Sequence, residues 1–216
     1  MALQICHSGA MTSSEIREKL LKADRKFAPV VEAIGDPPSF RAKPSDQRFG
    51  ALVSSVTSQL LSTKAAATIH GRLVEAVGGK VTPAAMLQVE LTQLRSAGLS
   101  NAKARTMIDL AQRVHGGHLR LDAHARLDDD TVTRELVTIN GVGPWTAHMY
   151  LLFTLGRKDI WPTGDMGVRN GWTIIHRLED RVSPMELEAV GRKFEGYRST
   201  VAWYCWQAVH LDRGDL

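Results

Sequence analysis

The sequence predicts an all-α protein, and three observations support this fold class. Apolar residues recur at helical spacing in nearly every periodic segment, and alternating β-branched runs bounded by hairpin dipeptides are missing. Helix-start patterns also occur, such as Ser183-Pro184-Met185-Glu186, a capping box with proline at the first helical position. The 216 residues are 44% hydrophobic, which is enough to bury a core in one large domain or two compact subdomains.

The first predicted helix begins at Thr12. The Thr12 hydroxyl can cap the helix while Glu15 reaches back to the cap, and apolar positions at helical spacing extend from there to Val31. Residues 1–11 precede this start signal, and we expect them to form a loose extension.

A linker follows this first helix. The prolines between residues 37 and 44 forbid a regular helix and place a boundary near residue 45. Beyond it, helical spacing and glycine breaks predict helices at 46–61, 63–77, 83–88, 91–97, 101–115, 129–139, 144–155, 165–177, 184–194 and 199–212.

Charge and cysteine content exclude several classes of protein. The net charge of +4 suits a polyanionic partner but does not require one. Cys6 and Cys205 are too few for a disulfide framework, a four-thiolate zinc site or an iron-sulfur cluster. The start has no secretory pattern, and the longest apolar stretch is too short to span a bilayer. We expect a cytoplasmic protein that needs no cofactor and no metal.

A glycine-containing turn between two apolar helices is the first candidate binding element. Asn140-Gly141-Val142-Gly143 interrupts helical spacing, which resumes at Pro144. Glycine permits a positive φ and a close backbone approach, and the second helix presents amides at its N-terminus, where a phosphate can bind. An ordinary turn between two helices uses glycine in the same way, so this pattern alone leaves both interpretations open.

The segment from Leu136 to Ala147 resembles the helix-hairpin-helix of the DNA glycosylase superfamily. In that superfamily an essential aspartate follows some twenty residues later, in a Gly/Pro-rich loop at the start of a helix. The resemblance selects Asp165 rather than Asp159 as the catalytic carboxylate. Taken alone, Asp165 has the more ordinary interpretation of a helix cap. A carboxylate there can stabilise positive charge on the deoxyribose and orient or deprotonate a water molecule.

The same resemblance implies contacts with the DNA backbone. It places the amides of Gly141 and Gly143 and the hydroxyl of Thr146 on phosphates. In some members of the superfamily the turn carbonyls, which are here those of Val137, Ile139 and Val142, also hold a monovalent cation. We treat that cation as optional.

Trp145 narrows the reaction. Superfamily members that nick the DNA backbone carry a lysine at this position, so the tryptophan excludes a Schiff base there. The hairpin instead resembles the alkylation-repair branch typified by 3-methyladenine DNA glycosylase II. In that branch the segment corresponding to Gln59, Leu60 and Ser62 fills the gap left by an everted nucleotide. Leu60 is the expected wedge, and one leucine of the Leu60-Leu61 pair is expected to belong to the core.

The closing helix of this branch also has a counterpart in the chain, from Tyr197 to Trp206. The resemblance places Trp145, Trp206, Met149 and Met166 around the base, where tryptophan faces suit a base made cationic by alkylation. The neighbouring Trp203 is expected in the core. For Arg198 two roles stay open, a brace for the catalytic loop and a contact with a phosphate.

The sequence therefore predicts a monofunctional glycosylase that removes alkylated purines (3-methyladenine, 7-methylguanine and ethenoadenine) from double-stranded DNA. We expect a monomer in the bacterial cytoplasm, associated with the nucleoid. The resemblance implies two helical subdomains flanking a cleft, without the additional N-terminal β domain of the best-known members. The expected regions are the extension at 1–11, a helix and linker at 12–45 that pack with the C-terminal helices, a central subdomain with the hairpin at 46–155, and a catalytic loop with C-terminal helices at 156–216. The alternatives are a non-enzymatic sensor of damaged DNA and a glycosylase for uracil or hypoxanthine.

Overall fold

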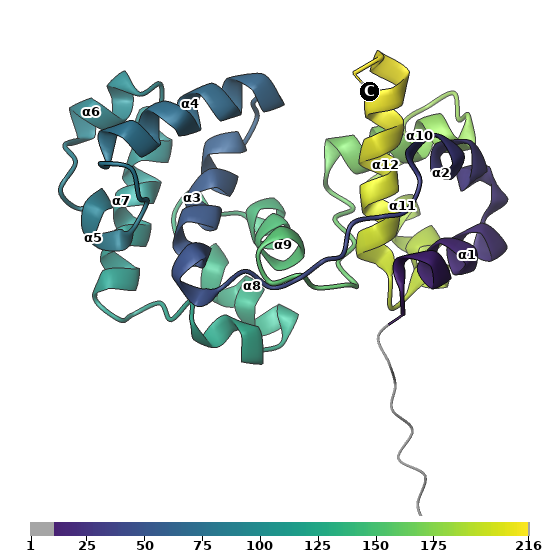
Figure 1. The fold of residues 1–216 in the computed structure, drawn as a ribbon, viewed down its shortest axis with the longest axis horizontal. Coiled ribbons are helices and arrows are strands. Elements are labelled where there is room, and N and C mark those ends of the chain that lie inside the picture. The colour runs from purple at the N-terminus through teal and green to yellow at the C-terminus, as the bar shows by residue number, and fades with distance from the viewer. Residues whose placement is uncertain (1–10, 216) are drawn as a thin grey trace, which may run out of the picture. The chain divides into compact units, whose positions relative to one another are not determined.

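The computed structural model describes residues 11–215, and these residues form helices and no strand (Figure 1). The all-α prediction is confirmed. The expected loose extension at 1–11 falls, apart from residue 11, outside the described residues. The chain forms two compact units, one built from residues up to Ser39 together with residues from Lys158 onward, and the other from Phe40–Arg157.

The Phe40–Arg157 unit is built around helix α3 (Arg48–Ser58). Helix α3 contacts α4, α7 and α9, and α8 packs against α9 (Figure 1). Its core includes the fully buried side chains of Leu52, Leu73, Leu110 and Tyr150. The elements of this unit are η2 (Ser45–Gln47), α3 (Arg48–Ser58), α4 (Thr63–Ala76), α5 (Pro83–Met86), α6 (Leu91–Ser96), α7 (Asn101–His115), η3 (Ala123–Arg126), α8 (Asp129–Val137) and α9 (Pro144–Phe153).

The other unit combines the two ends of the chain. Its elements are α1 (Ser13–Ala23), η1 (Arg25–Phe27), α2 (Ala28–Ile34), α10 (Met166–His176), α11 (Pro184–Gly191), η4 (Arg192–Phe194) and α12 (Arg198–Arg213). The rings of Phe27, Trp172 and Phe194 pack edge to face in its core, with centroids 5.9 to 6.1 Å apart. Aromatic packing thus joins the N-terminal helices to the C-terminal ones.

The predicted first helix is wrong in one respect, because it breaks at Asp24. The capping box of Thr12 and Glu15 starts α1 as predicted. At Asp24 the backbone becomes extended, and the carboxylate accepts hydrogen bonds from His176 Nε2 at 2.9 Å and Lys193 Nζ at 2.8 Å. Asp24 also caps η1 by accepting from the amide of Lys26 at 3.1 Å, which is a local signal, whereas His176 and Lys193 are distant in the sequence.

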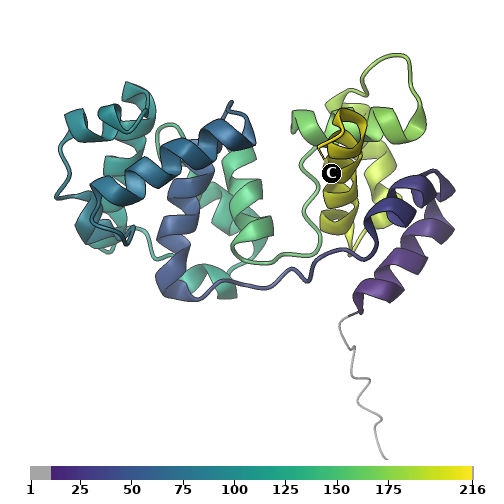
Figure 2. The same ribbon diagram turned by 45° about the horizontal axis from the view of Figure 1, so that its top comes forward.

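Helix α10, in green, and helix α12, in yellow, pack against each other (Figure 2). At this contact Gly171 of α10 meets the backbone of Cys205 of α12. A Cβ atom added to Gly171 would overlap the backbone carbonyl of Cys205. Glycine is therefore required here for backbone contact, while its φ stays in the helical range. This approach fixes how the two helices face each other along their length.

Within the described residues, no helix is both long enough and apolar enough to cross a bilayer.

The first prediction concerns this helix contact. We expect Gly171→Ala to lower the free energy of unfolding by about 1–3 kcal/mol or more, because the neighbouring atoms are backbone and cannot rotate away. Gly71→Ala is the matched control, since Gly71 lies in the interior of α4 with open space around it and should gain about 0.5–1 kcal/mol. Urea denaturation measures both changes. Equal stability of the two variants would contradict the close approach.

Candidate functional site

The predicted hairpin is the turn between α8 and α9. Helix α8 ends at Val137, the amide of Val142 donates to the carbonyl of Ile139 at 3.0 Å, and Pro144 begins α9. Gly141 has a φ of +87°, and an added Cβ would meet the hydroxyl of Thr106 on α7. Gly141 is thus required by both conformation and space. Its neighbour Gly143 has an extended backbone and caps α9.

Thr146 lies inside this hairpin rather than on its outer surface. Its side chain is only 1% exposed, and its hydroxyl accepts a hydrogen bond from Gln59 Nε2 at 2.8 Å. The same Gln59 amide donates to the carbonyl of Gly141 at 3.0 Å. Gln59 therefore connects the segment after α3 to the hairpin.

The segment after α3 forms an exposed turn. Leu60 is fully exposed and has a φ of +56°, which a non-glycine residue rarely adopts. Ser62 accepts a hydrogen bond from the amide of Ala65 and caps α4. The expectation that one leucine of the pair belongs to the core is wrong, because Leu61 is exposed as well. Helix α3 ends at Ser58, so both leucines lie beyond it.

Asp165 lies at the N-terminus of α10 in the other unit. Its side chain is only 7% exposed, and its Oδ1 atom accepts from the amide of Val168 at 2.7 Å and from Trp206 Nε1 at 2.9 Å. Asp165 is thus a helix cap and the partner of an indole at once. Gly167 leaves room for this arrangement, because a Cβ there would lie 2.7 Å from Trp206 Cδ1.

A buried thiol lies close to this carboxylate. Burial and then the charge of Asp165 raise the pKa of Cys205, so its thiol stays protonated and neutral. It therefore adds no second negative charge near Asp165.

Arg198 braces the start of the loop that leads to Asp165. Its guanidinium makes two hydrogen bonds with Asp159, Nε to Oδ1 at 2.7 Å and Nη2 to Oδ2 at 2.8 Å. Burial acts to raise the pKa of Asp159, but the hydrogen bonds from Arg198 and nearby amides hold it below its usual value. Of the two roles open for Arg198, this geometry supports the brace.

The four residues expected around the base belong to different elements. Trp145 and Met149 lie on α9, where Met149 is buried. Trp206 lies on α12, and Met166 begins α10 and is 52% exposed. Trp203 is half-buried, and its ring meets Tyr204 at a centroid distance of 4.9 Å.

Two guanidinium groups that the sequence did not indicate lie beside Met166. Arg181 donates to its sulfur at 3.0 Å and Arg169 at 3.9 Å, while Arg169 Nε also donates to the carbonyl of Val182 at 2.7 Å. Arg181 lies in a loop without a motif, so no local pattern indicated that it comes close to the start of α10.

His115, His118 and His124 are close together in the sequence, but their side chains have different surroundings. His124 is buried, with its ring nitrogens 3.2 Å from the Tyr150 hydroxyl and 3.0 Å from the Glu135 carboxylate, whereas His115 and His118 are exposed. Across the described part of the chain, no group of three His, Cys, Asp or Glu side chains is arranged to hold a metal ion.

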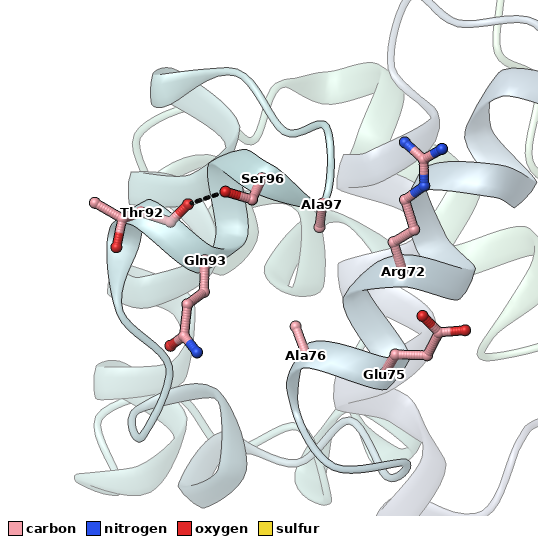
Figure 3. Close-up of a pocket in the computed structure, with 7 residues that line it drawn as sticks. All are labelled: Arg72, Glu75, Ala76, Thr92, Gln93, Ser96 and Ala97. Carbon is pink, nitrogen blue, oxygen red and sulfur yellow. Dashed lines mark hydrogen bonds between the residues drawn. The ribbon is translucent and has the colours of Figure 1, made fainter.

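Figure 3 shows a surface hollow that does not include the predicted site residues. Arg72, Glu75 and Ala76 of α4 form one wall, and the other wall is formed by Thr92, Gln93, Ser96 and Ala97. Its polar side chains are of mixed charge, and none of the residues predicted for chemistry or DNA contact lines it.

Comparisons with known proteins agree on one family. Residues 53–195 match the model of the HhH-GPD superfamily base excision DNA repair protein. DNA-3-methyladenine glycosylase 1 of Schizosaccharomyces pombe is 28% identical over 94% of this chain and 89% of its own. The resemblance predicted from the hairpin, Asp165 and Trp145 is confirmed.

Solved structures give the same result. The 3-methyladenine DNA glycosylase Mag1 of Schizosaccharomyces pombe, solved in complex with abasic DNA, superposes with a TM-score of 0.81 and 26% identity, covering 88% of this chain and 94% of that one. DNA-3-methyladenine glycosidase of Bacillus halodurans gives a TM-score of 0.76 and 29% identity, covering 93% and 91%.

The second prediction tests the hairpin turn. We expect Gly141→Ala to lower the free energy of unfolding by more than about 1 kcal/mol, since alanine disfavours the positive φ and its methyl group meets Thr106. Thermal unfolding measures this cost. Gly143→Ala is the control and should be nearly neutral, because its backbone is extended and its surroundings are open. A stable Gly141→Ala variant would show that the turn has another conformation.

Proposed function

This chain belongs to the HhH-GPD superfamily of base excision DNA repair proteins, and from that premise we propose that it removes alkylated purines from double-stranded DNA. The observation that carries the proposal is the pairing of Asp165 with Trp206 at the start of α10. The relatives named as 3-methyladenine glycosylases support the same substrate class. The alkylated base is 3-methyladenine first, with 7-methylguanine and ethenoadenine as further substrates.

In the proposed reaction, the bond between C1′ and the purine nitrogen breaks, and its electron pair leaves with the base. Alkylation makes 3-methyladenine and 7-methylguanine cationic in the nucleotide, so each departs as a neutral molecule without a strong general acid. Ethenoadenine is uncharged in the nucleotide, so it has to take up a proton from solvent water as it departs. The sugar gains positive charge, which the Asp165 carboxylate stabilises from nearby. A water oxygen then bonds to C1′, and Asp165 orients this water and accepts its proton.

Trp206 has two roles in this proposal. Its indole N–H holds the Asp165 carboxylate in place, and its ring lies beside the position where the reacting nucleotide must come. An electron-rich ring attracts a cationic base by stacking and by cation–π interaction. We propose the same contact for Trp145, with Met149 and Met166 as apolar neighbours of the base.

For DNA binding we assign different roles to the predicted residues. The amides of Gly141 and Gly143 bind the DNA backbone, since helix N-termini attract phosphate. Leu60 enters the duplex as the wedge and Ser62 contacts the strand beside it. Thr146 and Gln59 hold the hairpin in shape, because the Thr146 hydroxyl is buried against the Gln59 amide. The monovalent cation on the carbonyls of Val137, Ile139 and Val142 stays an optional part of the proposal.

We further propose that the protein acts as a monomer. We also propose that it does not cleave the strand, since Trp145 occupies the position of the lysine in strand-nicking relatives. A bacterial cytoplasm, in association with the nucleoid, is the location we infer for it.

The third prediction tests the carboxylate. We expect Asp165→Asn to slow release of free 3-methyladenine from methylated duplex DNA by about 10²–10³-fold, because the amide can still cap α10 but lacks the negative charge. DNA binding should be unchanged. Asp212→Asn, an exposed change on α12, is the control and should keep the wild-type rate.

Each other outcome of this assay has a definite meaning. An unchanged rate in Asp165→Asn would contradict the mechanism. Wild-type protein that binds the DNA but releases no base would instead be a non-enzymatic sensor. Duplexes that carry uracil or hypoxanthine, measured in parallel, test for a glycosylase of another lesion.

The fourth prediction separates the indole N–H from the aromatic ring. Trp206→Phe keeps a ring on α12 but removes the donor to Asp165, so the single-turnover rate should fall about tenfold or more. Trp203→Phe makes the same chemical change three residues earlier and should have the wild-type rate. Equal rates for both variants would mean that the hydrogen bond does not contribute to catalysis.

A further inference from the structure

The turn that carries Leu60 needs support from elsewhere in the protein. The backbone of Leu60 is in the left-handed region, which is unfavourable for a residue other than glycine. Because its side chain is fully exposed, packing of that side chain does not stabilise this conformation. Within the turn itself, the amide of Leu61 donates to the carbonyl of Ser58 at 3.2 Å. One such hydrogen bond is weak support for a strained turn at a surface.

Lys103 on α7 supplies additional support. Its ammonium group donates to the carbonyl of Thr57 at 2.8 Å and to that of Gln59 at 2.7 Å. The last carbonyls of a helix lack intrahelical partners and attract positive charge, so an ammonium group is well suited to the end of α3. The ammonium group is partly buried at this position, and the burial lowers the pKa of Lys103.

The same helix also supports the hairpin. Thr106 lies one turn after Lys103 on α7, and its hydroxyl donates to the carbonyl of Asn140 at 2.8 Å. Gln59 completes the connection, because its amide reaches Gly141 and Thr146. The start of α7 therefore holds two turns that are 80 or so residues apart in the sequence, and both lie in the Phe40–Arg157 unit.

We propose that Lys103 is a positioning residue for base eversion, which acts by holding the Leu60 turn in a fixed place relative to the hairpin. This inference rests on the proposed function, in which Leu60 enters the duplex while the hairpin grips the backbone. Leu60 can fill the gap left by the everted nucleotide only if it enters the duplex at the lesion. A loosened turn therefore reduces eversion without altering Asp165.

A direct phosphate contact by Lys103 is the competing interpretation. Two hydrogen bonds to carbonyls already orient its ammonium group toward the protein. The two interpretations differ in one measurable respect. A phosphate contact contributes to binding whether or not Leu60 is present, whereas a positioning role disappears when Leu60 is absent.

A double-mutant cycle tests this difference. The variants are Lys103→Met, which keeps the length of the side chain but removes its donors, Leu60→Ala, and the double variant. Single-turnover release of 3-methyladenine from duplex DNA should slow about tenfold in each single variant, and the double variant should be no slower than Leu60→Ala. Lys103→Arg retains donors and charge and should recover most of the rate.

Losses that multiply in the double variant would overturn the proposal, and so would a wild-type rate in Lys103→Met. Thermal unfolding checks that each variant is folded at the assay temperature. If Lys103→Met is not, Lys103→Gln replaces it, because its polar amide suits the site but is too short to reach both carbonyls.

A measurement without substrate separates this inference from the proposed function. Hydrogen exchange in the free protein should become about tenfold faster over residues 57–62 in Lys103→Met, with no change in α12. Unchanged exchange over 57–62 would overturn the support by Lys103. If the wild-type protein released no base, the proposed function would fail, while the exchange experiment would still decide whether Lys103 holds the turn.

Discussion

The close approach of α10 to α12 is the constraint on which the proposed chemistry depends. Because Gly171 lets the backbone of Cys205 come into contact with α10, the next residue on α12, Trp206, can reach the carboxylate that begins α10. Asp165 is then held by its own helix and by its neighbour. A side chain that ends a flexible loop would have to be ordered during the reaction, whereas this carboxylate is already in place.

The Phe40–Arg157 unit follows the same principle with different means. The segment after α3 and the hairpin are held through their carbonyl groups by side chains of α7 and, for the hairpin, also by Gln59 of the segment after α3. Gln59, Lys103 and Thr106 each donate to a turn or helix-end carbonyl. Such bonds leave the outer surface of the turns available for DNA. In both units, then, groups proposed to act on DNA are fixed from the protein side.

The parts of the site that lie within short contiguous segments could be predicted from the sequence. The glycine turn and the helix start at Asp165 are of this kind, and the resemblance of these segments to the DNA glycosylase superfamily then selects them as candidate site elements. Contacts between distant segments could not be predicted. The burial of Thr146 depends on Gln59, 87 residues earlier, and Asp24 accepts hydrogen bonds from His176 and Lys193. No local pattern contains these partners, so only the folded structure reveals them.

We propose that a carboxylate held by an indole removes the base by hydrolysis and leaves the DNA strand intact. One time course on alkylated duplex DNA, which follows free 3-methyladenine, abasic sites and strand breaks together, tests this proposal. Abasic sites should appear at the same rate as free base, on unbroken strands, and borohydride should trap no protein–DNA adduct. Strand breaks that accompany base release, or a trapped adduct, would contradict it.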